Sequence, residues 1–338
     1  MSTRAAIVGT ALLVASVTAA GCPLCIGTAA RSSSQDLDEL SHAVLAVPDG
    51  KQYRVVAVIK GDAPAGPITQ VVGHDPTLAG RLLLVRDEQW PMWISLGQLG
   101  AAETPALRVL AAERPAEADA AAWQRRLDVA VPQLVSREPL MAELAYGACA
   151  SAPYAALRAA RDDLDVATVR ALAADPASGR RRSLYVLLLG IAGNAQDAAS
   201  LETQIEAAWT AHATTDLSSL LAADLELRGA TRVDWIEEKY LRDPSRTVAE
   251  IQAALLALSV QAKSRGPVPR ERVIEADMAF IAAHPDMAGF VAADLATWGY
   301  WEAAPEFASI LKTNIRQHDD SRAAMVAYLR QSPLQWSE

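Results

Sequence analysis

The stretch LAADPASGRRRSLYVLLLGIAGNAQDAASLE, residues 172–202, decides the fold. It has an Asp-Pro turn, then an apolar segment of helical length, then Gly193 and Asn194, and then a second, alanine-rich segment. Apolar residues recur in both segments with a period near 3.6, which is typical of amphipathic helices. Pro and Gly-Asn mark the ends of such helices. The stretch therefore predicts two consecutive helices joined by a short turn.

The same pattern continues along most of the chain. Pro176, Pro244 and Pro285 each follow Asp or His and open a similar unit, which indicates an internal helical repeat. We expect helices over residues 117–133, 138–150, 153–161, 165–174, 179–192, 196–210, 216–228, 231–242, 246–263, 269–283, 286–298, 303–314 and 319–331.

The unit at residues 172–202 resembles a HEAT-type repeat, in which two helices pack as a pair and successive pairs stack. Alanine makes up about a fifth of the chain, and small side chains let stacked helices approach closely. The resemblance implies that residues 117–338 form a HEAT-like α-solenoid.

Between residues 42 and 96 the hydrophobic period is two instead. Five short β-branched segments, separated by Pro and Gly, predict strands over residues 43–47, 53–59, 68–72, 82–85 and 92–96. Strands of this number and length suggest a small antiparallel barrel or sandwich of the OB kind, and the layout is similar to that of netrin-like domains. Trp90, Pro91 and Trp93 flank the last segment, and we expect them to cover the end of the barrel.

These patterns predict an α+β chain that is mostly α. A small β domain with an N-terminal CxxC arm is expected over residues 22–97, and the helical repeat domain is expected over residues 117–338. The segment 98–116 between them is rich in alanine, proline and glutamate, and we expect a linker there.

Residues 1–21 are interpreted as an export signal. Arg4 supplies a positive start, residues 5–17 are apolar, and small residues lead up to Cys22. The apolar run is too short to span a bilayer, and no later run is longer, so we expect an exported chain, periplasmic or extracellular, without a transmembrane span. A lipid anchor at Cys22 is an alternative, although Ala19 stands where lipoprotein signals usually have leucine.

Cys22 and Cys25 form the only closely spaced cysteine pair, in Cys22-Pro23-Leu24-Cys25. In an oxidising compartment they can form a local structural disulfide, take part in thiol–disulfide exchange, or bind a metal. The third cysteine, Cys149, lies far away in an alanine-rich helix. A metal site needs further ligands, and the five histidines are scattered, so the sequence names no metal for this pair.

Composition excludes several classes of protein. With 338 residues and 51% apolar residues, the chain has too much apolar content for a disordered protein. Its formal net charge of −9 argues against nucleic-acid binding, which requires a basic surface. Three cysteines are too few for a disulfide scaffold. No nucleophile elbow, Walker loop, dinucleotide fingerprint, zincin motif or EF-hand loop occurs, so no cofactor and no catalytic residue are expected.

The whole chain resembles an uncharacterised family of exported bacterial proteins with an N-terminal CPxC motif. The similar segments are Cys22-Pro23-Leu24-Cys25, Ala145-Tyr146-Gly147, Ala152-Pro153-Tyr154, Leu184-Tyr185 with Leu189-Gly190, and Val291-Ala292-Ala293-Asp294-Leu295-Ala296. This resemblance implies a small β domain followed by a HEAT-like array, and it implies no activity.

Two groups are candidates for an interaction surface. Arg180, Arg181 and Arg182 form a basic triplet in an acidic chain, and they suit a partner's carboxylates or a phosphate. Trp298, Tyr300 and Trp301 form the densest aromatic group and suit a sugar ring or a peptide.

Two hypotheses for the function follow. The first is a non-enzymatic scaffold or protein–protein interaction module whose partner is another envelope protein. The alternative is a thiol–disulfide or metal-handling protein acting through Cys22 and Cys25.

Overall fold

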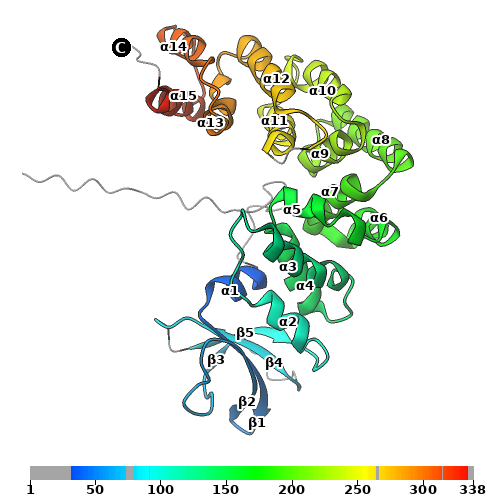
Figure 1. Cartoon of the computed structure of the whole chain (residues 1–338), viewed down its shortest axis with the longest axis vertical. Coiled ribbons are helices and arrows are strands. Elements are labelled where there is room, and N and C mark those ends of the chain that lie inside the picture. Colours follow the sequence, from blue (N-terminus) through cyan, green and yellow to red (C-terminus); the bar gives the residue numbers. More distant parts are fainter. Residues whose placement is uncertain (1–31, 74–78, 91, 264–265, 314, 334–338) are drawn as a thin grey trace, which may run out of the picture.

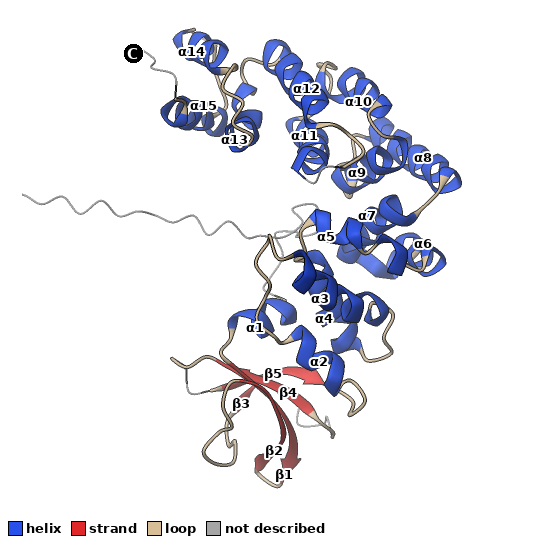
Figure 2. Ribbon diagram, in the orientation of Figure 1, coloured by secondary structure: helices blue, strands red, loops and turns tan. Residues whose placement is uncertain are grey.

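A small sheet near the N-terminal side is followed by helices to the end of the chain (Figures 1 and 2). The computed structural model describes residues 32–73, 79–90, 92–263, 266–313 and 315–333. The predicted export signal and Cys22-Pro23-Leu24-Cys25 lie outside the described residues. The predicted class, α+β and mostly α, is confirmed.

The sheet has five strands in the order β2-β1-β4-β5-β3. They are β1 (His42–Asp49), β2 (Gln52–Lys60), β3 (Val71–Val72), β4 (Leu82–Arg86) and β5 (Trp93–Gln98). Three neighbouring pairs are antiparallel, whereas β3 runs parallel to β5. The sheet is therefore mixed, and the wholly antiparallel arrangement expected from the sequence is wrong for this pair. A hydrophobic period of two locates a strand but does not give the direction of its neighbour.

An isolated antiparallel bridge joins Ile68, just before β3, to Tyr53 in β2. Because β2 and β3 are the two ends of the strand order, this bridge brings the edges of the sheet together. Side chains on one face fill the resulting interior, namely Val44, Ala46, Ile68, Leu82, Leu84 and Trp93. Side chains on the other face of β1 and β4 belong to the large core that also contains the helices.

Two short helices cover that second face of the sheet. The first, α1 (Ser33–Glu39), starts with a capping box in which the Ser32 side chain accepts from the Gln35 N–H. The second, α2 (Thr104–Leu110), lies within the segment 98–116 that we expected to be a linker. Leu107 and Leu110 of α2 are buried in the large core.

The remaining helices lie close to the predicted positions. They are α3 (Ala120–Gln133), α4 (Pro139–Ala150), α5 (Tyr154–Ala159), α6 (Val166–Ala174), α7 (Arg182–Ala192), α8 (Ala195–Ala211), α9 (Leu217–Arg228), α10 (Thr231–Ile236), α11 (Val248–Lys263), α12 (Arg270–Ala283), α13 (Ala292–Thr297), α14 (Ala304–Lys312) and α15 (Asp319–Gln331). Shorter helical segments are η1 (Arg161–Asp163), η2 (Pro176–Arg181), the π-helical η3 (Glu237–Leu241) and η4 (Ala288–Val291).

Successive helices stack in two layers along an arc. Helix α7 packs on α6 and α9, α9 packs on α8 and α11, and α11 packs on α12. Figure 1 shows α7, α9, α11, α13 and α15 on the hollow side of the arc, with α6, α8, α10, α12 and α14 outside. The β domain forms one end of the arc, and α13–α15 form the other end.

The stretch 172–202 folds as η2, α7 and α8. The Asn194 side chain accepts hydrogen bonds from the N–H groups of Gln196 and Asp197, and so it caps α8 as its sequence predicts. Gly190 of α7 lies against Ala223 of α9, where an added Cβ would come within 2.4 Å of the Ala223 Cα. Small residues at this crossing therefore allow the close stacking of α7 and α9.

Candidate functional site

The cysteine pair predicted to be functional, Cys22 and Cys25, lies outside the described residues. The third cysteine, Cys149, is a free and fully buried thiol in α4. Burial raises the pKa of Cys149 to about 12, so this thiol stays protonated and unreactive at neutral pH.

The basic triplet holds helix pairs together. Arg181 donates to Glu143 of α4, and its guanidinium lies 5.5 Å from the centre of the Tyr146 ring. Arg182 donates to the Asp216 carboxylate at 2.6 Å and to the Ala173 carbonyl at 3.0 Å. The third member, Arg180, has 61% of its side chain exposed and lies 3.8 Å from Glu143. Two of the three cations are thus used in internal contacts between helices.

The aromatic group at residues 298–301 joins the last helices of the arc. Trp298, Tyr300 and Trp301 are half-buried and pack against the large core. The Trp301 ring lies 5.0 Å from the ring of Tyr328 in α15, whose hydroxyl donates to the Tyr300 carbonyl. The ring contact and the hydrogen bond of Tyr328 therefore join α15 to the segment between α13 and α14.

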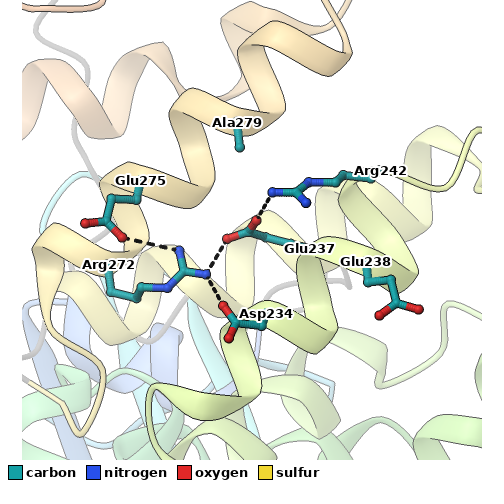
Figure 3. Close-up of a pocket in the computed structure, with 7 residues that line it drawn as sticks. All are labelled: Asp234, Glu237, Glu238, Arg242, Arg272, Glu275 and Ala279. Atoms are coloured by element: carbon teal, nitrogen blue, oxygen red, sulfur yellow. Dashed lines mark hydrogen bonds and ion pairs between the residues drawn. The ribbon is translucent and has the colours of Figure 1, made fainter.

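A polar groove of about 580 Å³ lies between α10, η3 and α12 on the outer side of the arc (Figure 3). Arg272 of α12 donates to Asp234 and Glu237 at 2.5 Å, and Arg242 donates to the other oxygen of Glu237 at 2.5 Å. Burial lowers the pKa of Arg272, but hydrogen bonds and charges from its two carboxylate partners raise it by more. The net pKa is raised, so Arg272 stays protonated.

Both arginines of this groove are paired with carboxylates, as Figure 3 shows. Arg272 pairs with Asp234 and Glu237 of the facing segment, whereas Arg242 pairs with Glu237 of its own helical segment. Its lining includes a single apolar side chain, that of Ala279. The groove is thus lined by a network of ion pairs that joins α12 to α10 and η3. Within the described residues, no group of three or more His, Cys, Asp or Glu side chains is placed to hold a metal ion.

A different kind of site lies on the β domain, between α1 and the strands β3 and β5. It is a cleft of about 420 Å³, which we call the β-domain cleft. Its lining residues are Asp36, Leu40, Val72, Asp87, Trp90, Met92 and Ile94. Seven large apolar side chains are exposed in the described part of the chain, and Val72, Trp90, Met92 and Ile94 are four of them. Exposed apolar side chains therefore gather at this one place.

Strand register explains how the cleft arises. Ala43, Val85, Ile94 and Val72 are successive cross-strand partners on β1, β4, β5 and β3, so they share one face of the sheet. The exposed fraction along this row is 1% for Ala43 and 0% for Val85, but 40% for Ile94 and 48% for Val72. The helices that cover the face over β1 and β4 leave it bare over β5 and β3.

Two further side chains shape the walls of the cleft. Leu40 follows the end of α1, and Trp90 lies in the turn between β4 and β5. In that turn the Asp87 carboxylate accepts a hydrogen bond from the Gln89 N–H at 2.8 Å. Trp90 is 66% exposed, which is the largest exposed fraction among the large apolar side chains of the described residues.

Sequence reasoning missed this cleft, although a signal is present. We expected Trp90 and Trp93 together to cover the end of the barrel. Trp93 does point into the sheet's interior, where the Arg86 guanidinium lies 5.1 Å from its ring centre. Met92, just before β5, and Ile94 within it are apolar too, so both faces at the start of β5 are apolar. In a strand next to the edge of a small sheet, apolar side chains on both faces indicate a second apolar contact besides the sheet's interior.

Comparison with known proteins adds no relative. No protein-family model, no curated protein and no solved structure matches this chain. No helix in the described residues has the length and apolar character needed to cross a membrane. The likeness to exported CPxC proteins therefore remains an expectation from the sequence.

Proposed function

We propose that this chain is an exported, non-enzymatic scaffold or protein–protein interaction module of the cell envelope. The observation that carries the proposal is the β-domain cleft, where Val72, Trp90, Met92 and Ile94 are exposed side by side. Contiguous apolar surface of this kind is uncommon on a protein that works alone, and it marks binding sites. Trp is also among the residue types that contribute most to protein–protein binding.

The arc of stacked helices supports the same function. Stacked helix pairs give an extended concave surface, which repeat proteins use to hold partners. The basic triplet and the aromatic group contribute to this proposal indirectly, since their contacts set how neighbouring helix pairs are joined.

Affinity capture from envelope extracts tests the proposal. The bait is used as the wild-type chain, as Trp90→Ser, and as Val135→Ser, which removes an exposed apolar side chain that does not line the cleft. We expect one partner that the wild-type and Val135→Ser chains retain and that Trp90→Ser loses. A set of captured proteins that is identical for all three baits would contradict the proposal.

The mass of the exported chain tests its export. Cleavage after Gly21 removes Arg4 and no acidic residue, so the net charge becomes −10 and Cys22 becomes the first residue. A chain that keeps residues 1–21 in the envelope fraction contradicts the export signal. Added acyl mass on Cys22 would show lipid anchoring instead of a free N-terminus.

A further inference from the structure

The side chains of the β-domain cleft restrict what can bind there. Its floor and walls are apolar, from Leu40, Val72, Trp90, Met92 and Ile94. A volume of about 420 Å³ lies in the range of clefts that bury a compact ligand or a few side chains. The occupant must therefore bring large apolar groups to this surface.

Charge restricts the occupant further. The two ionisable residues of the lining, Asp36 and Asp87, are both acidic, and Glu39 and Glu88 are exposed near them in the sequence. Among the residues that the structure describes, no lysine or arginine lines the cleft. A negative rim around an apolar floor attracts a cationic group and repels an anionic one.

These two restrictions separate the possible occupants. A second copy of this chain would bring its own acidic rim, and the chain carries a net charge of −9. A bilayer rich in anionic lipid would repel the same rim. A protein segment in which apolar side chains stand next to lysine or arginine meets both requirements.

We propose that the β-domain cleft binds a segment of a partner protein that carries at least two large apolar side chains next to a lysine or arginine. This inference rests on the proposed interaction function and adds the chemistry of the partner. The partner's apolar side chains lie on Val72, Met92 and Ile94 and against Trp90. The partner's basic group faces Asp87 and Asp36.

Three labelled peptides of equal length test the inference on the full mature chain by fluorescence anisotropy. The first combines leucine with lysine, the second combines leucine with glutamate, and the third combines serine with lysine. Vesicles of anionic and of zwitterionic lipid serve as separate probes. The protein variants are Trp90→Ser, Ile94→Ser and Asp87→Asn, with Val135→Ser as the matched control.

We expect the leucine–lysine peptide to bind at one per chain and the other two peptides to bind at least about tenfold more weakly. Trp90→Ser and Ile94→Ser should each weaken that binding about tenfold, because each removes apolar contact area. Asp87→Asn keeps an acceptor for the Gln89 N–H and should weaken binding about threefold through the lost charge. Val135→Ser should bind as the wild type does.

The outcomes that overturn the inference are distinct from those that overturn the function. If the leucine–glutamate peptide binds equally well and Trp90→Ser weakens both, the cleft is an interaction surface for another chemistry. Vesicle binding that depends on Trp90 would assign the cleft to lipid and overturn the inference. The inference also fails if no peptide binds, whereas the proposed function is still decided by the capture experiment.

Discussion

Asp277 is a buried carboxyl group with a strongly altered titration. It lies in α12 with 3% of its surface exposed. Burial raises the pKa of Asp277 well above its usual value, and the nearby Asp294 carboxylate raises it further. Asp294 itself is paired with Lys263 of α11 at 2.6 Å. The folded chain therefore holds the Asp277 proton more tightly than the unfolded chain does.

This shift predicts how stability changes with pH. Because the folded chain binds the Asp277 proton more tightly, protonation of this group stabilises the fold. This stabilisation is complete below the unfolded-state pKa of about 3.9, and it is lost as pH rises through the higher folded-state pKa. Asp277→Asn removes the ionisable group. As pH rises from 4 to 7, the free energy of unfolding of this variant should therefore fall less than that of the wild type. Urea titrations across this range measure the difference. Asp62→Asn, at an exposed position, is the control, and equal pH profiles for wild type and Asp277→Asn would refute the prediction.

Glu250 is a buried carboxylate with the opposite shift. Burial raises its pKa, but hydrogen bonds from Thr247 and His212 and the charge of Arg246 lower it by more, so the pKa lies below its usual value. The Thr247 N–H donates to Glu250 at 2.9 Å, and Arg246 donates to its other oxygen at 2.9 Å. Glu250 thus ties the start of α11 to the end of α8.

We expect Glu250→Gln to lower the free energy of unfolding by about 2 kcal/mol at pH 7, because it weakens charge-assisted bonds to a buried arginine. The stability that the charge supplies is present above the unfolded-state pKa and is lost as pH falls through the folded-state pKa. The gap between variant and wild type should therefore narrow in acid below about pH 4. Glu238→Gln, on the exposed side of η3, should change stability by less than about 0.5 kcal/mol. If the difference in free energy of unfolding between Glu250→Gln and the wild type is the same at pH 7 and in acid, the charge of Glu250 does not supply this stability.

At the scale of elements, the crossing of α7 and α9 depends on Gly190. A Cβ there would come within 2.4 Å of the Ala223 Cα, which is backbone and cannot rotate away. We expect Gly190→Ala to lower the free energy of unfolding by about 1–3 kcal/mol, despite alanine's higher helix propensity. Thermal and urea denaturation measure it. Gly66→Ala, where no atom lies within 4 Å of the new Cβ, should be nearly neutral, and a neutral Gly190→Ala would show that the two helices can move apart.

Most elements were predictable from periodicity. The helix expected over residues 196–210 is α8 (Ala195–Ala211), and the strand expected over residues 82–85 is β4 (Leu82–Arg86). These segments have a clear hydrophobic period and clear end signals such as Asn194. Local sequence fixes such elements because their pattern repeats within a few residues.

Long-range features were not predictable in the same way. Helix α2 was missed because its seven residues include Pro105 and lie in a segment that resembles a linker. The parallel pairing of β3 with β5 depends on how the chain returns to the sheet, which no local pattern records. The β-domain cleft depends on where the helices stop covering the sheet, so only the assembled layers show that Ile94 is left bare.

At the scale of the whole molecule, many charged groups of the helical array are used internally. Arg170 donates to Asp197 at 2.7 Å, and Arg158 donates to Glu226 at 2.6 Å, so each pair joins different helices. The exposed apolar side chains, in contrast, gather at the β-domain end of the arc. We therefore assign contact with a partner to that end.

Site-specific photocrosslinking in the native envelope tests this assignment most directly. A photoreactive aromatic amino acid, which keeps a large apolar ring at the position, replaces Trp90 in one chain and Val135 in another, and both chains are expressed at the same level. The account predicts one crosslinked partner protein at position 90, absent at position 135 and lost when Ile94→Ser is added. No adduct at position 90, or the same adducts at both positions, would contradict it.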